Sequence, residues 1–331
     1  MDIQILLFLQ EFREGAGAFL ADFMAKMTFL GEINSAIVIM AIVYWCFSKE
    51  TGAYLLMGWA GNRLLNGVLK VTACVYRPWI RDARIVPYGN AITTATGYSF
   101  PSGHTMNAAT IFGGTALKKN LPKAMRIVLF AILFFVAFSR IFLGVHTPQD
   151  VLVGAIGGTL MMFLVMKILE WTDKNPKMDI AVVCIGILLA VGVAVYAGVK
   201  PYPEDYDEAG KLIVDGAKMA NDTFKGVGFC IGILTGWILE RRFVKFSTTD
   251  IPMEIRAARL VFGLLIYYLV SLILSPAIKN WISGPAGTLL SSFVQMFYVM
   301  FLYPCGIKFF ERSKTGEKGK IRKLRNDRIK K

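Results

Sequence analysis

Residues 124–171 read AMRIVLFAILFFVAFSRIFLGVHTPQDVLVGAIGGTLMMFLVMKILEW, and this stretch decides the fold. Two apolar runs, 124–145 and 148–171, stand on either side of a short polar segment that begins at His146. A helix needs roughly 20 residues to cross a bilayer core of about 30 Å, and both runs are long enough. The sequence therefore predicts two membrane spans joined by a short turn that carries a histidine.

Similar apolar runs occupy most of the chain, of which 55% is apolar and only 18% charged. This composition predicts an all-α fold, a polytopic membrane helical bundle. We expect about eight or nine spans, because several candidate stretches are short or contain polar residues. The candidate stretches are 33–48, 54–76, 102–117, 124–145, 148–171, 178–199, 224–240, 258–275 and 285–303.

These stretches divide the chain into five parts. Residues 1–32 place charges among apolar positions at helical spacing, which predicts an amphipathic surface helix and no cleaved signal peptide. Residues 33–199 are expected to form a six-span core, and 200–223 an acidic extracytoplasmic loop. Residues 224–303 would add two or three spans, and 304–331 would form a basic cytoplasmic tail.

The distribution of basic residues predicts the orientation. If the spans alternate in direction, one set of connections holds 23 Lys and Arg and the other set holds 10. Basic connections are retained on the cytoplasmic side, so the richer set should be cytoplasmic. The 304–331 tail has eleven basic and three acidic residues, and we expect it to contact anionic cytoplasmic lipid.

Two other features have simpler explanations. The net charge of +14 would suit nucleic-acid binding, but membrane topology explains it, so no nucleic-acid partner is expected. The five cysteines stand singly, without the paired spacing of a disulfide framework or a zinc site, and are interpreted as buried thiols. The sequence indicates no particular oligomeric state.

The first chemically informative segment is Lys70-Val-Thr-Ala-Cys-Val-Tyr-Arg77-Pro78. Seven residues at about 100° each place Lys70 and Arg77 on nearly the same helix face, and Pro78 ends the helix. Charges inside apolar spans are expensive and are functional candidates, although snorkelling would explain Arg77 better than Lys70. Arg63 lies seven residues before Lys70 and is therefore a third cation on the same helix face, deeper in the bilayer. For Arg63, pairing with an intramembrane acid or snorkelling is favoured over substrate contact.

The second segment is Phe100-Pro101-Ser102-Gly103-His104-Thr105, directly before an apolar run. Proline and serine open a helix there, and its free N–H groups beside a small glycine form an anion site. His104 would stand in the first turn, beside any bound anion. A purely structural histidine at a helix start is the alternative.

The third segment contains Ser139-Arg140, then His146 and Asp150. Thr147-Pro148-Gln149-Asp150 has the form of a helix cap, which gives Asp150 a capping role. His146 lies just before that cap. A nearby carboxylate could hold the proton on one ring nitrogen and leave the other nitrogen free to attack.

With alternating spans, all three segments fall on the outward face. Three cations, a helix N-terminus and the only two histidines of the chain would then converge. Such a cluster favours an oxyanion of high charge, and phosphate is the natural candidate.

The three segments resemble the signature of the type 2 phosphatidic acid phosphatase superfamily, written K-x6-R-P, P-S-G-H and S-R-x5-H-x3-D, without a departure. The resemblance covers residues 33–199 and implies an integral membrane lipid phosphate phosphatase that uses no metal and no other cofactor. By this resemblance His146 would be the nucleophile, Asp150 its orienting partner and His104 the general acid. The phosphate oxygens would be held by Lys70, Arg77, Ser102, Gly103 and Arg140.

The resemblance leaves the substrate and the reaction open. We expect hydrolysis of polyprenyl diphosphate, of phosphatidic acid or phosphatidylglycerol phosphate, or of sphingoid phosphate, in that order. A lipid phosphotransferase with the same phosphohistidine intermediate is one alternative. A transporter or scaffold that retains the site, with residues 224–303 as its working part, is another. The expected location is the bacterial cytoplasmic (inner) membrane, with the active site extracytoplasmic.

Overall fold

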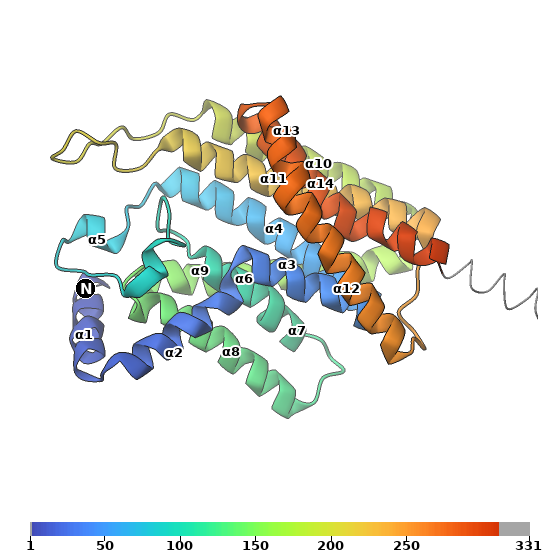
Figure 1. Ribbon diagram of the computed structural model, residues 1–331, viewed down its shortest axis with the longest axis horizontal. Coiled ribbons are helices and arrows are strands. Elements are labelled where there is room, and N and C mark those ends of the chain that lie inside the picture. The colour runs from blue at the N-terminus through green and yellow to red at the C-terminus, as the bar shows by residue number, and fades with distance from the viewer. Residues whose placement is uncertain (1, 311–331) are drawn as a thin grey trace, which may run out of the picture.

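The computed structural model describes residues 2–310, and this part of the chain is built almost entirely of helices (Figure 1). Besides helices, it contains one isolated bridge, between Tyr206 and Leu212. The predicted all-α membrane bundle is confirmed. Of the basic tail predicted over 304–331, residues 311–331 lie outside the described range.

The N-terminal segment differs from the single surface helix expected over 1–32. It forms α1 (Asp2–Gly15) and α2 (Ala18–Thr28), because Gly17 adopts φ 79° between them, a conformation that interrupts a helix. Both helices are held against the polar end of the bundle. Arg13 is buried and donates to the carbonyl oxygens of Phe142 (3.0 Å) and Val86 (2.8 Å).

A six-element core follows. The helix α3 (Ile33–Ile42) continues into a π-helical turn at Val43–Phe47, and together they are bent by 58° from α2. The remaining core helices are α4 (Lys49–Ala73), α6 (Gly103–Ala108), α7 (Gly114–Ala116), α8 (Lys123–Phe142), α9 (Pro148–Lys174) and α10 (Asp179–Val199). A π-helical turn at Ala109–Gly113 joins α6 to α7.

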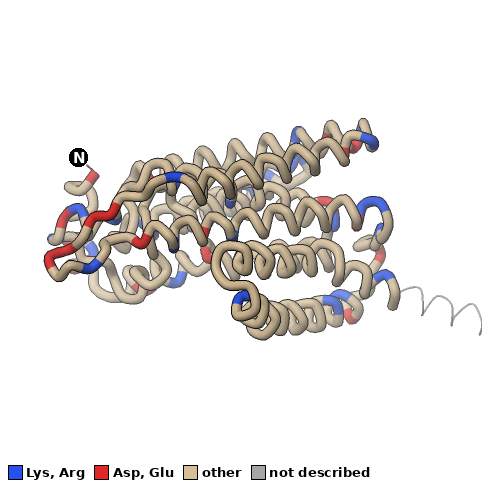
Figure 2. The backbone as a smooth tube through the Cα atoms, turned by 90° about the horizontal axis from the view of Figure 1, so that it is seen from above, with Lys and Arg blue, Asp and Glu red and all other residues tan. Residues whose placement is uncertain are grey.

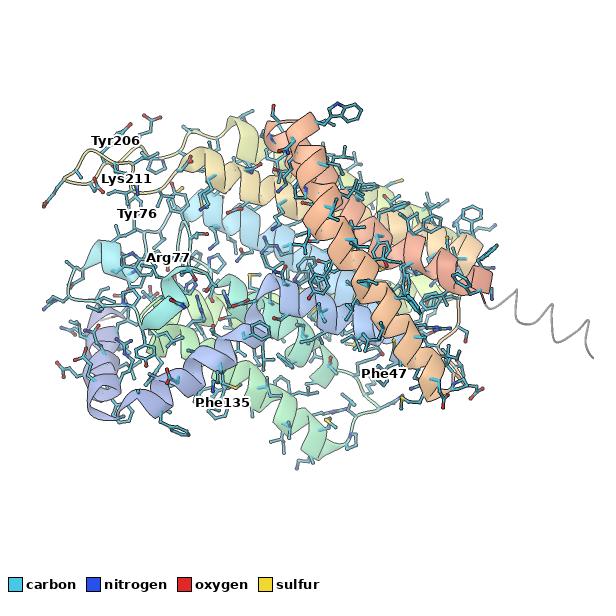
Figure 3. All side chains as sticks on the ribbon, viewed as in Figure 1. Phe47, Tyr76, Arg77, Phe135, Tyr206 and Lys211 are labelled. Atoms are coloured by element: carbon cyan, nitrogen blue, oxygen red, sulfur yellow. The ribbon has the colours of Figure 1, made fainter. Side chains whose placement is uncertain are left out.

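Residues 74–102, which we call the site loop, connect α4 to α6 and contain only the short helices α5 (Pro78–Arg81) and Gly89–Ile92. The acidic connection between α10 and α11 lies over the end of α4, where the Tyr76 hydroxyl donates to Asp205 Oδ2 at 2.5 Å (Figure 3). Figure 2 shows acidic positions gathered at this same end of the bundle.

The four helices after the acidic connection, which we call the extension, are α11 (Gly216–Leu239), α12 (Met253–Leu269), α13 (Ser275–Trp281) and α14 (Gly284–Phe297). Glycines let α11 and α14 approach closely. A β-carbon added at Gly228 would lie 2.2 Å from the Leu289 carbonyl oxygen, and one at Gly232 would lie 2.5 Å from that of Phe293. Stripes of small residues are typical of tightly packed membrane helix pairs.

Within residues 2–310, five helices are long and apolar enough to cross a membrane, or six if the bent pair α2–α3 is one span. The eight or nine expected spans also counted α4, the α6–α7 segment and α11. The α6–α7 segment is short, and the other two carry charged residues such as Arg63, Lys70 and Lys225. The helices that fail the apolar criterion are those that bring polar groups to the site.

Candidate active site

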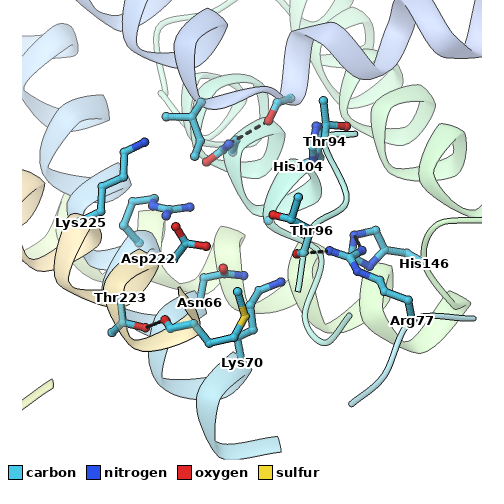
Figure 4. Close-up of a pocket in the computed structure, with 17 residues that line it drawn as sticks. Asn66, Lys70, Arg77, Thr94, Thr96, His104, His146, Asp222, Thr223 and Lys225 are labelled. Carbon is cyan, nitrogen blue, oxygen red and sulfur yellow. Dashed lines mark hydrogen bonds between the residues drawn. The ribbon is translucent and has the colours of Figure 1, made fainter. Parts of the chain in front are cut away.

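The end of α4, the site loop, α6 and α11 enclose a cavity of about 200 Å³ (Figure 4). Residues from all three sequence segments line it: Lys70, Arg77, Gly103, His104 and His146. The structure thus brings to one place groups that lie up to 76 residues apart in the chain. Arg140, Ser102 and Asp150 lie behind this lining and are buried.

His146 is held by a carboxylate. Asp150 Oδ2 lies 3.3 Å from His146 Nδ1 and also accepts the Thr147 backbone N–H at 2.8 Å. The Thr147 hydroxyl in turn accepts the Asp150 N–H at 3.4 Å, which completes the capping box at the start of α9. Asp150 therefore both caps a helix and orients the histidine ring.

The other ring nitrogen of His146 faces a cation. Arg77 Nη1 lies 2.9 Å from His146 Nε2, and a guanidinium can only donate, so Nε2 must be the acceptor and the ring proton sits on Nδ1. Burial, followed by the charge of Arg77, holds the pKa of His146 well below its ordinary value. His146 is therefore neutral at physiological pH, and its Nε2 lone pair accepts a hydrogen bond from Arg77.

Backbone carbonyls of the site loop and of the turn before α9 position Arg77. Its guanidinium donates to the carbonyl oxygens of Thr96 (3.1 Å), Gly97 (3.0 Å) and Val145 (3.0 Å). Burial lowers the pKa of Arg77 to about 10, which leaves it fully charged at neutral pH. Lys70 is fixed in the same way by the Tyr98 carbonyl oxygen at 2.8 Å.

Two further groups have unused hydrogen-bonding capacity. Arg140 is fully buried and donates through Nη1 to the Thr28 hydroxyl at 2.7 Å, but its Nε and Nη2 have no partner among residues 2–310. His104 Nε2 is likewise buried without a partner. Buried unpaired polar groups are costly, and an oxyanion in the cavity would satisfy them.

The charge at this end of the cavity also suits a dianion. Lys70, Arg77 and Arg140 outnumber the nearby carboxylates of Asp150 and Glu32, which leaves positive charge in excess. A phosphate monoester at neutral pH carries close to two negative charges.

Ser102 and Gly103, both predicted to contact phosphate, are placed differently. Gly103 lines the cavity. The Ser102 hydroxyl instead accepts the Thr105 N–H (3.4 Å) and hydroxyl (2.9 Å), and the Ser102 N–H donates to the Asp150 carbonyl oxygen (3.0 Å). Ser102 caps α6 and does not line the cavity, because the first turn of this helix uses its serine hydroxyl as the cap.

Sequence reasoning missed Ser99 and Asn66. Ser99 is fully buried and its hydroxyl donates to Asp150 Oδ2 at 2.5 Å, on the far side of His146 from Arg77. No spacing rule connects Ser99 to Asp150. Asn66 lines the cavity four residues before Lys70, so helical spacing on the face of Lys70 could have identified it.

Two regions of the chain are similar to known protein families. Residues 51–174 match the PAP2 superfamily, and residues 224–312 match the family described as PAP2 superfamily phosphatase, transmembrane extension. The chain is 35% identical over 158 residues to phosphatidylglycerophosphatase B of Bacillus subtilis, covering 44% of this chain and 73% of that protein. It is 38% identical over 84 residues to undecaprenyl-diphosphatase of Sulfolobus acidocaldarius, covering 25% and 39%.

Among solved structures, a transmembrane PAP2 type phosphatidylglycerolphosphate phosphatase from Bacillus subtilis aligns with 31% identity and a TM-score of 0.43. The alignment covers 51% of this chain and 84% of that one. The helical bundle and the family matches define an integral membrane phosphatase. The chain belongs to the PAP2 superfamily, and the resemblance seen in its three motifs is confirmed.

Proposed function

We propose that the protein hydrolyses a lipid phosphate monoester or a lipid diphosphate through a phosphohistidine at His146. The observation that carries this proposal is the pairing at His146, whose Nδ1 faces Asp150 while Nε2 faces Arg77 in the cavity. The names of the relatives, a phosphatidylglycerophosphatase and an undecaprenyl-diphosphatase, support a lipid substrate.

In the first step the lone pair of His146 Nε2 forms a bond to phosphorus, and the bond from phosphorus to the lipid-side oxygen breaks. His104, which becomes protonated when the phosphate dianion binds beside it, gives this proton to that oxygen, so the lipid product leaves as an alcohol or as a lipid monophosphate. The Asp150 carboxylate stabilises the positive ring that forms. Lys70, Arg77 and Arg140 stabilise the phosphate oxygens, for which Arg77 must turn from Nε2 toward the phosphate.

In the second step water attacks the phosphohistidine. His104, now neutral, takes a proton from that water, and the bond between Nε2 and phosphorus breaks to release inorganic phosphate. Both histidines return to their starting state, so the net reaction consumes one water and forms one phosphate.

The test is phosphate release from a panel of lipids by the detergent-purified protein. The panel contains polyprenyl diphosphate, phosphatidylglycerophosphate, phosphatidic acid and a sphingoid phosphate, each with and without a chelator. We expect release from at least one lipid, unaffected by the chelator and blocked by vanadate, which mimics five-coordinate phosphorus. Transfer to an added alcohol in place of release would indicate the phosphotransferase, and no turnover of any lipid would favour a transporter or scaffold.

We also propose that the active site faces outward from the bacterial cytoplasmic membrane. The split of 23 against 10 basic residues supports this side. The connection between α7 and α8 lies at the opposite end of the bundle from the site loop (Figure 1). Asn90, in the site loop, and Asn120, in that connection, are both exposed. In intact cells Asn90→Cys should react with an impermeant thiol reagent and Asn120→Cys should not; the reverse pattern would overturn the orientation.

The division of the chain into parts is likewise a proposal. Residues 33–199 would carry the chemistry, with the basic residues of 304–331 contacting anionic lipid on the cytoplasmic side.

A further inference from the structure

One wall of the active-site cavity comes from the extension. Met219, Asp222, Thr223 and Lys225 of α11 line the same cavity as His146. Figure 4 shows Lys225, Asp222 and Thr223 on one side of the cavity and His146 on the other, beside Arg77. The superfamily motifs include none of these α11 residues.

Close packing fixes this wall against α4. A β-carbon at Gly67 would lie 3.1 Å from Cγ2 of Thr223, and one at Gly226 would lie 3.6 Å from the Arg63 carbonyl oxygen. The two glycines let α4 and α11 pack closely, as small residues do between membrane helices. The side chains of Asp222 and Lys225 therefore have a defined place beside Arg63.

Arg63 also lines the cavity, and no carboxylate of the described residues forms an ion pair with it there. It lies seven residues before Lys70, on the same face of α4 and about 10 Å along the helix axis. The sequence favoured pairing with an intramembrane acid or snorkelling, and Asp222 is an acid that acts on Arg63 electrostatically. Within residues 2–310, however, Arg63 makes no ion pair, and its Nε is buried without a hydrogen-bond partner.

The cavity thus contains positive charge on two sides. On the side of His146, Lys70, Arg77 and Arg140 would hold the phosphate that is attacked. The other side has Arg63 and Lys225 against Asp222, an excess of one positive charge. A phosphate that is esterified or bridged on two sides carries one negative charge, which matches this excess.

We propose that Arg63 and Lys225 bind a second phosphate of the substrate, located on the leaving group beyond the phosphate that His146 attacks. The preferred substrates would then be lipids with two phosphates close together, either a lipid diphosphate or a phosphodiester joined through glycerol to a terminal phosphate. Asp222 limits the affinity of this second subsite. The inference rests on the proposed phosphatase function and assigns substrate selection to the extension.

Lys225→Gln tests the proposal, with Lys218→Gln as the matched control on the same helix. Lys218 is exposed and lies outside the cavity lining. For each protein, kcat/KM is measured on polyprenyl diphosphate against polyprenyl monophosphate, and on phosphatidylglycerophosphate against phosphatidic acid. A charged hydrogen bond contributes enough that its loss should lower the two-phosphate preference about tenfold in Lys225→Gln, and not in Lys218→Gln.

The outcomes separate the inference from the function on which it rests. If the kcat/KM ratio falls for the polyprenyl pair, the second phosphate is that of a lipid diphosphate. If it falls for the other pair, the second phosphate is the phosphodiester of phosphatidylglycerophosphate. Unchanged ratios for both pairs in Lys225→Gln would overturn the second subsite while leaving the phosphatase intact. A wild-type protein that releases phosphate from none of the four lipids would instead refute the proposed function.

A second test uses water-soluble inhibitors, so that its result does not depend on how a lipid is dispersed in detergent. Pyrophosphate and orthophosphate are compared as competitive inhibitors of nitrophenyl phosphate hydrolysis. The wild type should bind pyrophosphate the more tightly; Lys225→Gln should reduce this preference and Asp222→Asn should increase it, because the two changes alter the local charge in opposite directions. Changes in the same direction, or no preference in the wild type, would contradict the proposal. Each readout is a ratio, so a lower yield of folded variant does not affect it.

Discussion

The phosphatase core and the extension both line the active-site cavity, yet the three short sequence motifs lie only in the core. The core places its chemical groups at fixed spacings, such as Lys70 and Arg77, because attack and proton transfer need contacts near 3 Å. The extension contributes through close helix packing and two charged side chains, Asp222 and Lys225. Reaction chemistry constrains a few residues strictly, whereas packing and selectivity can be met by many different sequences.

The largest expected effect lies in the core and separates its two histidines. His146→Ala removes the covalent path, so activity on every substrate should disappear. His104→Ala removes only proton donation, which is worth roughly 10²–10⁴-fold and is needed most when the leaving group is a basic lipid alkoxide. His104→Ala should therefore lose much more activity on a lipid monoester than on nitrophenyl phosphate, measured as kcat/KM.

A phosphorylated intermediate provides an independent check. It should be trapped in His104→Ala with nitrophenyl phosphate and never in His146→Ala. Equal fractional losses on both substrates for the two variants would mean that the roles are wrongly assigned, or that His104 only binds phosphate.

The extension should respond to a change in packing. Gly228→Ala places a methyl group against the Leu289 carbonyl oxygen and should cost about 1–3 kcal/mol of stability, because α14 must move away. Gly192→Ala on α10 is the control, since nothing lies within 4 Å of the position. The measurement is thermal denaturation in detergent. Equal midpoints for both variants would show that the α11–α14 contact is unimportant.

Ser99 tests whether the core depends on groups outside its motifs. Ser99→Ala removes the hydrogen bond to Asp150, and a hydrogen bond to a charged group is worth about 1.5–3 kcal/mol, so kcat should fall at least about tenfold with KM unchanged. Ser35→Ala is the matched control, because the Ser35 hydroxyl is buried without a partner. A rise in KM with kcat unchanged would assign Ser99 to binding in place of positioning.

The smallest expected effect is in the pH profile. The pKa of His146 is lowered by burial and by Arg77, and the neutral ring is the nucleophile, so the reactive form persists as the pH falls through 6.5. The acid limb of kcat/KM, corrected for the second ionisation of the substrate, should therefore lie below pH 6.5. A limb at or above 6.5 would mean that His146 is not held neutral in the free enzyme.

Part of the site could be predicted from local geometry, namely the Asp150 capping box and the histidine before it. The single helix face expected for Lys70 and Arg77 is wrong, because α4 ends at Ala73, Cys74 adopts φ 46° and Arg77 lies in the site loop. Both side chains nevertheless line the same cavity. Ser102 is placed differently because the start of α6 uses its hydroxyl as a cap. Ser99 and Lys225 could not be predicted, because their neighbours in space are 51 and more residues away in the chain.

The sequence by itself determined that this protein is a helical membrane bundle, and it predicted that its two histidines and three cations lie close together. Apolar run length and short-range spacing carry that information, since both depend only on helix geometry and bilayer thickness. Only the tertiary structure decided that Arg77 faces His146, that Ser99 supports Asp150 and that α11 closes the cavity beside Arg63. Such contacts join residues that are far apart in the chain. They depend on how side chains of different helices fit together, and a local sequence pattern does not contain that information.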